Sequence, residues 1–157
     1  MKTLYFDVDG TVLLADQDEP KPCLASGRLE AAVRRAGFLK LVCVGNFCRI
    51  AGMIKEIGVE YDELGVLLGI CRGVFTDAQW FRSVASLVRD PQHRTEHIDF
   101  SSDWWYLDDL AAQYLLEANQ EHVLTIHQGR RVFMPSPIGD GQDILDWLKE
   151  TSGPTKD

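Results

Sequence analysis

Residues 3–13 read TLYFDVDGTVL, in which a short apolar run is followed at once by two carboxylates. The run LYF at 4–6 is typical of a strand that is buried on both faces of a sheet, so Asp7 and Asp9 are expected where that strand leaves the core. Side chains at positions i and i+2 of an extended chain point the same way, and two anions at this spacing repel each other unless a cation, a shared proton or water separates them. A solvated turn is the ordinary interpretation of Asp-x-Asp-Gly. The buried strand in front and the Thr-apolar-apolar run behind favour a functional site instead.

The rest of the chain alternates between patterns typical of buried strands and patterns typical of amphipathic helices. Further strands are expected at 38–46 (FLKLVCVGN), 65–70 (GVLLGI) and 103–110 (DWWYLDDL). Helices are expected at 26–37, 50–57, 77–89, 111–118 and 143–150. Ser26 and Gly37 are the expected caps of the first helix, and Thr76 with Gln79 forms a capping box for the helix at 77–89.

The late stretch HVLTIHQGRRVFMP at 122–135 fits two structures. One is a hairpin that turns at Gln128 and Gly129, and the other is a strand with a long approach. With either, strands and helices alternate from end to end, which predicts an α/β fold: a doubly wound, Rossmann-like parallel sheet with helices on both faces. The length of 157 residues and the 45% hydrophobic content predict a single domain at 1–150, with 151–157 as a flexible tail.

Composition argues against several classes of partner. The formal net charge is −8 and the basic pairs Arg34–Arg35 and Arg130–Arg131 are short, so neither a nucleic acid nor a membrane surface is an expected partner. The four cysteines form no Cys-x-x-Cys pair, and His93 with His97 lacks a third ligand, so no zinc site is expected. No signal-peptide segment and no apolar run long enough to span a bilayer is recognisable, which predicts a reduced, cytoplasmic protein.

Polar residues collect where the predicted strands end. Because the carboxyl ends of parallel strands meet at one edge of a sheet, these residues are expected to form one crevice. Several carboxylates at one edge repel each other strongly, and a hard cation such as Mg2+ is the usual compensation. The residues at the strand exits are Asp7, Asp9, Gly45, Asn46, Asp108 and Asp109.

Two of these stretches resemble motifs of a known family. DVDGTV at 7–12 resembles the nucleophile motif Asp-x-Asp-Gly-Thr of the haloacid dehalogenase (HAD) superfamily, and WWYLDD at 104–109 resembles its late acidic motif. The resemblance covers the order of elements over about residues 3–119. The short stretches between the early strands leave room for a flap at most, so the chain resembles a small member without a large cap domain.

The resemblance implies a Mg2+-dependent phosphohydrolase that acts on a small phosphorylated substrate through an aspartyl-phosphate. Asp7 would attack phosphorus, and Asp9 would protonate the leaving oxygen and then activate water. By the same resemblance, Mg2+ would be held by Asp7, the backbone carbonyl of Asp9 and Asp109, with Asp108 acting through water. Gly10 would allow a sharp turn, and Thr11 would orient the loop.

The chain departs from the family pattern at two positions. Gly45 and Asn46 stand where the superfamily places a Ser or Thr after the second strand, so a backbone N–H and the Asn46 amide are the expected phosphate contacts. No lysine occurs between Lys55 and Lys149, so an arginine must take the place of the family's cation. Arg72, which precedes a predicted helix, is the first choice. The other candidates are Arg82, Arg89 and Arg94, and each is expected to be an ordinary surface arginine.

Three alternatives remain at the level of sequence. The missing hydroxyl and lysine suggest a catalytically degenerate HAD-like fold that serves as a binding or interaction module. The acidic pair in WYLDDL is also typical of a phosphoacceptor receiver domain, but such a pair should open the chain and be followed by a late lysine. GDGQD at 139–143 ranks below LDD as a metal loop, because Pro135 and Pro137 interrupt its approach and a helix-capping turn explains it. A site without a lid admits bulky substrates or is covered by a second subunit, so a homo-oligomer is an additional expectation.

Overall fold

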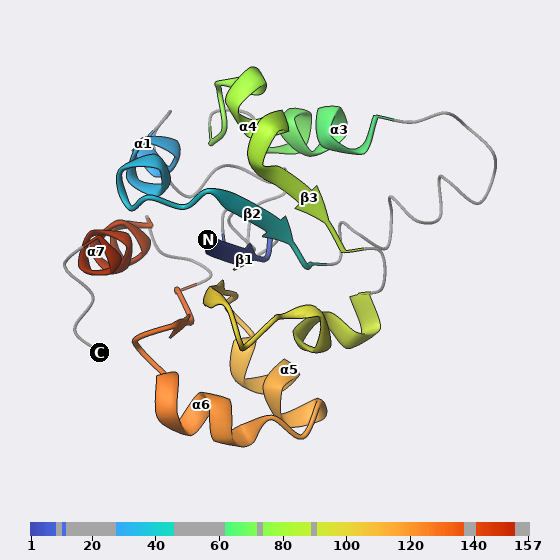
Figure 1. The fold of residues 1–157 in the computed structure, drawn as a ribbon, viewed down its shortest axis with the longest axis vertical. Helices are drawn as coiled ribbons and strands as arrows, with labels where there is room; N and C mark the ends of the chain where they lie inside the picture. The colour runs from blue at the N-terminus through green and yellow to red at the C-terminus, as the bar shows by residue number, and fades with distance from the viewer. Residues whose placement is uncertain are drawn as a thin grey trace.

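A computed structural model of the protein describes residues 1–8, 11, 28–45, 62–71, 74–88, 91–136 and 141–152. These residues form a five-stranded sheet with the order β3-β2-β1-β4-β5, and every neighbouring pair is parallel (Figure 1). The strands are β1 (Lys2–Phe6), β2 (Lys40–Cys43), β3 (Ala85–Leu87), β4 (Asp103–Leu107) and β5 (Val132–Phe133). The predicted doubly wound α/β fold is confirmed.

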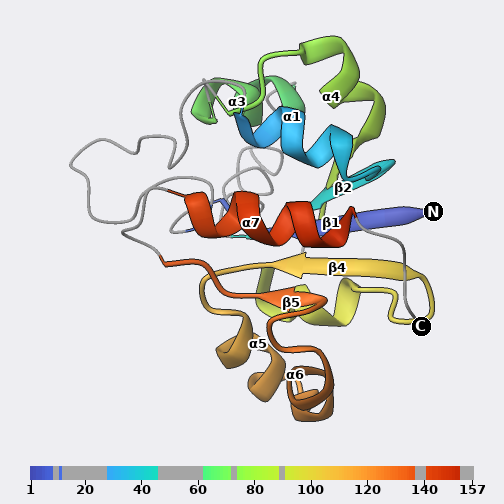
Figure 2. The same ribbon diagram turned by 90° about the vertical axis from the view of Figure 1, so that its left-hand side faces the viewer.

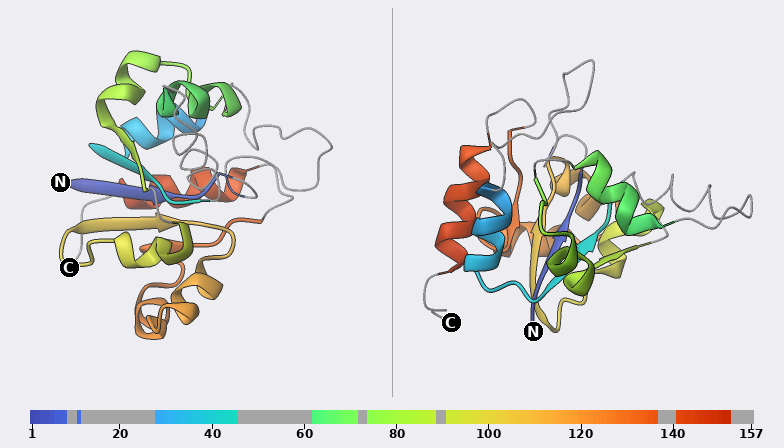
Figure 3. Two further views of the ribbon diagram at one scale, coloured as in Figure 1. Left: turned by 90° about the vertical axis from the view of Figure 1, so that its right-hand side faces the viewer. Right: turned by 90° about the horizontal axis from the view of Figure 1, so that it is seen from above.

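Helices cover both faces of the sheet, as Figure 2 shows from one side and Figure 3 from the other. One face carries α1 (Arg28–Arg35), α3 (Glu63–Ile70), α4 (Ala78–Val84) and α7 (Gln142–Thr151). The other face carries a 3-10 helix η1 (Pro91–His97), α5 (Ala111–Glu117) and α6 (Glu121–His127). None of the helices in the described ranges is long and apolar enough to cross a membrane.

The central strand explains why the sheet is buried on both sides. Along β1, Leu4 and Phe6 pack into the larger apolar cluster with α1, α3, α4 and α7, whereas Tyr5 packs into the cluster with α5 and α6. This alternation follows from the period of two in an extended chain. A strand with apolar residues at successive positions therefore needs a layer of helices on each face.

The order of the strands reverses between β1 and β4. The chain runs outward from β1 through β2 to β3, and then crosses back to place β4 on the other side of β1. Phe6 lies in register with Leu107, and the Asp7 backbone N–H donates to the Leu107 carbonyl at 3.0 Å. The residues that follow β1 and β4 are therefore neighbours at the switch point, where ligands bind in open α/β sheets.

Two predictions about the third strand are wrong. The run GVLLGI at 65–70 lies in helix α3, whose first turn is capped by the Asp62 side chain accepting from the Gly65 N–H at 3.1 Å. A short run that is apolar at nearly every position does not distinguish a buried strand from a buried helix. The third strand is instead Ala85–Leu87, where the predicted 77–89 helix ends early at Val84.

The predicted capping box is also wrong. Asp77, not Thr76, caps α4, because its side chain accepts from the Trp80 N–H at 3.0 Å. The Thr76 hydroxyl donates to the buried Glu30 carboxylate at 2.8 Å, and Glu30 also accepts from the Asp77 N–H. Glu30 on α1 therefore outcompetes the local capping partner that the sequence suggested.

Of the two structures predicted for 122–135, the hairpin is wrong, whereas the strand with a long approach is found, although its approach is mostly helical. Most of its first half is helix α6, and the short strand β5 then runs parallel to β4. The helices predicted at 111–118 and 143–150 are confirmed, and so is the one at 26–37 where it is described. Gly37 ends that first helix with a φ of 85°, the left-handed conformation expected of a C-terminal glycine. Ser26, the helix at 50–57 and most of the predicted tail lie outside the described residues.

Candidate functional site

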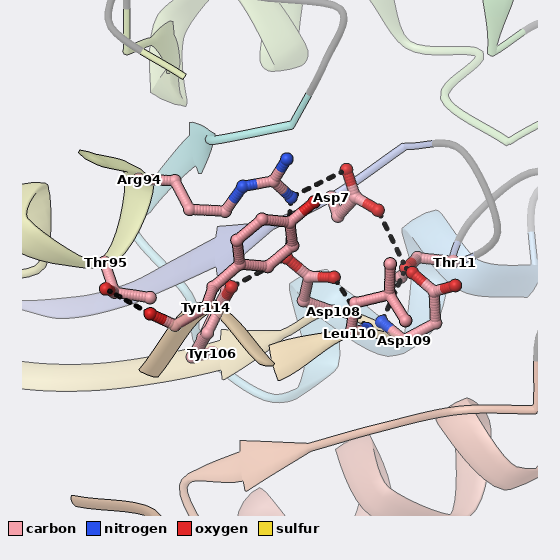
Figure 4. Close-up of polar contacts among 9 residues, drawn as sticks. All are labelled: Asp7, Thr11, Arg94, Thr95, Tyr106, Asp108, Asp109, Leu110 and Tyr114. Atoms are coloured by element: carbon pink, nitrogen blue, oxygen red, sulfur yellow. Dashed lines mark hydrogen bonds and ion pairs between the residues drawn. The ribbon is translucent and has the colours of Figure 1, made fainter. Parts of the chain in front are cut away.

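Three carboxylates meet at the carboxyl ends of β1 and β4 (Figure 4). Asp7 follows β1, and Asp108 and Asp109 follow β4. One carboxylate oxygen of each residue lies within 4.8 Å of the other two. Asp7 and Asp108 are buried and Asp109 is half-buried. The topology thus brings together acids that are about a hundred residues apart in sequence, as the strand exits predicted.

The end of β2 is shaped around the Asp7 side chain. A Cβ atom added to Gly45 would lie 1.9 Å from Asp7 Oδ1, far inside van der Waals contact. Any other residue at this position would force the carboxylate or the backbone to move. Gly45 was predicted at the site for its backbone N–H, and the structure gives it a steric role as well.

Thr11 joins the loop after β1 to the loop after β4. Its buried Oγ1 accepts a hydrogen bond from the Asp109 N–H at 3.1 Å. The same hydroxyl lies 3.4 Å from Asp7 Oδ2 and 3.3 Å from Asp109 Oδ1. A hydroxyl carries one proton and therefore donates to one of these two carboxylates at a time. Thr11 is thus in a position to orient both acids.

Asp108 is held entirely by protein donors. Its Oδ2 accepts from Arg94 Nη1 at 2.9 Å and from the Tyr106 hydroxyl at 2.6 Å. Its Oδ1 accepts from the Leu110 N–H at 3.0 Å. The side chain is 0% exposed, so these bonds replace water completely.

Arg94 supplies the cation of the site. It comes from η1, is 3% exposed, and its Nη1 lies 2.9 Å from Asp108 and 3.5 Å from Asp7. The Arg94 Cζ lies 3.6 Å from the centre of the Tyr114 ring. Burial lowers the pKa of Arg94, but Asp108 and Asp7 outweigh this effect and raise it above its usual value, so the guanidinium is charged.

The expectation that Arg94 is a surface residue is therefore wrong. Arg82, another candidate, lies on the surface of α4, where it pairs with the exposed Asp62 that caps α3. Arg72 and Arg89 lie outside the described residues, as do Asp9, Gly10 and Asn46. Arg94 stands 14 residues before Asp108 in sequence, directly upstream of the strand that delivers the acidic pair. That adjacency was the available signal for its role.

Among the described residues, the site carries more negative charge than Arg94 balances. Burial and the nearby Asp108 raise the pKa of Asp7 to about 8, although Arg94 acts in the opposite direction. Burial and Asp108 also raise the pKa of Asp109. Both shifts report that a second and third anion are costly here in the absence of a further cation. A hard divalent ion with oxygen ligands fits such a set of donors.

Two tyrosines complete the site and were not predicted. Tyr106 lies two residues before Asp108 on the same strand, so both side chains point to one face of the sheet and can bond each other. Burial, together with Asp108, raises the pKa of Tyr106 well above its usual value, so its hydroxyl remains a donor. Tyr114 lies on α5 and covers one face of Arg94. The i, i+2 spacing could have identified Tyr106, whereas nothing local in the sequence indicates the Tyr114 contact.

The other acidic loop, at 139–143, has a structural explanation where it is described. Asp143 lies in the first turn of α7, and its carboxylate accepts from the Ser136 N–H at 3.0 Å.

Comparison of the chain with protein-family models, with curated proteins and with solved structures found no match. The function is therefore inferred from the sequence motifs and from the geometry at the switch point.

Proposed function

We propose that the protein is a Mg2+-dependent phosphohydrolase of the haloacid dehalogenase type, which cleaves a phosphomonoester through an aspartyl-phosphate on Asp7. One observation carries the proposal. The buried Asp7 carboxylate, at the carboxyl end of the central strand, lies within reach of two further carboxylates and of the Arg94 guanidinium. The DVDGTV motif, in which Asp7 is the first residue, supports the same assignment.

The carboxylates at this edge fit a magnesium ion. Asp7 and Asp109 would hold it, because their oxygens are less fully engaged by protein donors than those of Asp108. Asp108 would act indirectly, by holding Arg94, because its own oxygens are buried and occupied by protein donors. When bound, Mg2+ would neutralise charge on the phosphoryl oxygens and polarise the phosphorus centre. The resemblance also assigns the backbone carbonyl of Asp9, outside the described residues, to this ion.

Asp7 has the properties of a nucleophile that is activated by its surroundings. As an anion it would attack phosphorus, forming a bond from Oδ to phosphorus as the bond to the ester oxygen breaks. The departing oxygen would take a proton from Asp9, which would then remove a proton from the water that hydrolyses the aspartyl-phosphate. Because burial and Asp108 raise the pKa of Asp7 to about 8, the Asp7 carboxyl is largely protonated at neutral pH until a cation binds beside it. Cation binding and formation of the nucleophile are thereby coupled.

Arg94 would supply the positive charge that the family pattern assigns to a basic side chain. Its donors lie in the plane of the guanidinium, and Nη1 already faces Asp7 and Asp108. A phosphoryl group placed in line with Asp7 would come within reach of the same group. Fixed donors aimed at developing charge in a water-poor site are the usual source of electrostatic catalysis.

The proposal is tested by Asp7→Asn, which keeps the shape of the side chain and removes its charge. We expect Mg2+-dependent hydrolysis of a generic aryl phosphate to fall by about a thousandfold or more, because the covalent route is lost. In the metal-free protein, the melting temperature should stay nearly the same at neutral pH, where Asp7 is largely protonated, and should rise above pH 8, where the substitution removes one of the clustered anions. Asp146→Asn, the same substitution at an exposed position on α7, is the matched control and should retain full activity.

Intact mass measurements give a second reading of the same proposal. The wild-type protein should gain the mass of one phosphate from acetyl phosphate in Mg2+, and the Asp7→Asn variant should not. Retained hydrolysis in Asp7→Asn would exclude Asp7 as the nucleophile. If the wild type hydrolyses no phosphoester across a broad panel and is never phosphorylated, the enzyme proposal fails.

One observation favours a second candidate, the binding module. Arg94 bridges Asp7 and Asp108, which compensates part of the charge of the cluster from within the chain, and Gly45, at the end of β2, carries no hydroxyl. A fold kept for binding would retain this charge-compensated arrangement while dispensing with turnover. The binding-module candidate predicts that calorimetry detects binding of Mg2+ and phosphate, while no phosphoester is hydrolysed and no phosphoprotein forms.

A further inference from the structure

The Tyr114 ring stacks against the Arg94 guanidinium. The Arg94 Cζ lies 3.6 Å from the ring centre, so the planar guanidinium rests on the face of the ring (Figure 4). The donors of a guanidinium point outward in its own plane. A ring on the face therefore leaves those donors available for anions while it excludes water and limits rotation.

One short segment of the chain holds Arg94 both at its edge and on its face. Asp108, at the end of β4, accepts from Nη1, and Tyr114 stands on the helix that begins three residues after Asp108. The Leu110 N–H donates to Asp108 Oδ1, and the Tyr114 N–H donates to the Leu110 carbonyl at 3.2 Å. Two hydrogen bonds through Leu110, one to the Asp108 carboxylate and one from the Tyr114 N–H, thus link the carboxylate to the helix that carries the ring.

A second contact joins η1 to α5 at the same position. The hydroxyl of Thr95, next to Arg94 in sequence, lies 3.5 Å from the Tyr114 carbonyl, at the limit of hydrogen-bond distance. Thr95 is buried, whereas Tyr114 is only half-buried. Tyr114 makes no hydrogen bond to Asp7, Asp108 or Asp109 among the described residues. Its ring acts on the acidic cluster through Arg94.

We infer that Tyr114 is a positioning residue, which holds the Arg94 guanidinium in the orientation that presents its in-plane donors to the substrate's phosphoryl group. The inference rests on the proposed phosphohydrolase function and assigns it a residue outside the two acidic motifs. Without the ring, Arg94 keeps its charge but becomes hydrated and free to turn. Phosphoryl binding and transition-state stabilisation should weaken, whereas the carboxylates that would hold Mg2+ remain in place.

The test compares Tyr114→Phe, which keeps the ring, with Tyr114→Leu, which removes it. In Mg2+, we expect Tyr114→Leu to lose about tenfold in kcat/KM for an aryl phosphate, the factor that corresponds to a desolvated cation–π contact of about 1.4 kcal/mol. The affinity for inorganic phosphate, measured by calorimetry in Mg2+, should fall in parallel. Tyr114→Phe should stay within about twofold of the wild type in both measurements. Leu116→Ala, at an exposed position on the same helix, is the matched control and should change neither.

Mg2+ affinity and melting temperature separate positioning from general stability. We expect Mg2+ affinity in the absence of phosphate to be unchanged in Tyr114→Leu. Wild-type phosphate affinity and kcat/KM in Tyr114→Leu would overturn the inference. So would equal losses in Tyr114→Phe, which would assign the effect to the hydroxyl, or a parallel loss of Mg2+ affinity and melting temperature.

Two further outcomes are distinguishable from these. If Tyr114→Leu does not fold, Tyr114→Met, which fills a similar volume without a ring, takes its place under the same criteria. If the wild type itself neither turns over an aryl phosphate nor binds phosphate, the proposed function has failed and the inference fails with it. If the wild type is active and any of the overturning results above is found, the inference alone has failed and the proposed function stands.

Discussion

Strands β1 and β4 carry charged residues at both of their ends, and the two ends differ in how those charges are balanced. At the amino end, Lys2 lies in register with Asp103, and Arg131 pairs with Asp103 at 2.9 Å. At the carboxyl end, three carboxylates lie together, and in the described part of the chain Arg94 is the cation that pairs with two of them, Asp7 and Asp108. The same pair of neighbouring strands therefore has one end rich in cations and one end rich in anions.

The cations at the amino end have internal partners. Lys2 Nζ donates to the carbonyls of Ala36 and Thr151, at the carboxyl ends of α1 and α7, where the helix dipole favours a cation. Arg131 also donates to the Trp104 carbonyl at 2.7 Å, and both cations rest against the Trp105 ring. Such a cluster needs no ligand. In the acidic cluster, by contrast, burial and the neighbouring Asp108 raise the pKa values of Asp7 and Asp109, and among the described residues Arg94 is the cation beside them.

Among changes that leave the acidic residues themselves in place, the largest effect is expected from a single methyl group at the carboxyl end. Gly45→Ala would place a Cβ atom 1.9 Å from Asp7 Oδ1 and must displace the carboxylate. A displacement of about 1 Å in a reacting group costs about a hundredfold in rate, so activity should fall by at least that factor. Steady-state kinetics with an aryl phosphate measures the loss, and circular dichroism checks that the fold persists.

Gly69→Ala is the matched control for this substitution. Gly69 lies in α3 with nothing within 4 Å of an added Cβ, so the change should leave activity intact and stabilise the helix by about 1 kcal/mol. Full activity in Gly45→Ala would show that the precise position of Asp7 is unimportant. It would also remove the steric reason for a glycine at the end of β2.

The acidic end of β1 and β4 could largely be predicted from the sequence, because its carboxylates directly follow the apolar runs that form these strands. The apolar runs of β1, β2 and β4 identify their carboxyl ends, and the parallel fold then places Asp7 near Asp108. The third strand could not be identified, because a run such as GVLLGI fits a buried helix as well as a strand.

The cation and the aromatic residues of the site were harder to predict for a different reason. Arg94 lies in a 3-10 helix without an apolar period, and its contacts with Asp7, Asp108 and Tyr114 come from distant parts of the chain. Arginines are mostly exposed, and the closeness of Arg94 to Asp108 in sequence was the one signal that set it apart from the other candidates. Contacts between an irregular segment and the end of a strand depend on tertiary packing, which local patterns do not encode.

A somewhat smaller effect is expected in the pH dependence of Mg2+ binding. Asp7, with a pKa of about 8 in the metal-free protein, must lose its proton before it can hold the ion. Mg2+ affinity should therefore rise with pH by up to about tenfold per unit below pH 8 and level off above it. Calorimetry in buffers of different ionisation enthalpy should detect the released proton.

The stability of the metal-free protein should change in the opposite direction. The folded-state pKa of Asp7 lies above its unfolded value, so the folded state binds more protons between about pH 4 and 8 and loses stability as pH rises through that window. Mg2+ should reverse this loss most strongly near pH 8. The Asp7→Asn variant should lose most of this dependence in both measurements. A pH-independent Mg2+ affinity in the wild type would contradict the raised pKa.

The smallest effect, and no effect on catalysis, is expected at the amino end. Lys2→Met keeps the aliphatic stem against Phe38 and Trp105 but leaves the carbonyls of Ala36 and Thr151 without their donor. The loss should cost about 2 kcal/mol of unfolding free energy, or about 4 to 8 °C in melting temperature for a chain of this size.

Lys40→Met, which removes the same charge from an exposed position at the start of β2, should leave the melting temperature nearly unchanged. Because Lys2 lies at the opposite end of β1 from Asp7, kcat/KM measured well below the melting temperature should equal that of the wild type. A loss of activity without a loss of stability in Lys2→Met would mean that the two ends of the strand are coupled, and the division between a structural end and a functional end would not hold.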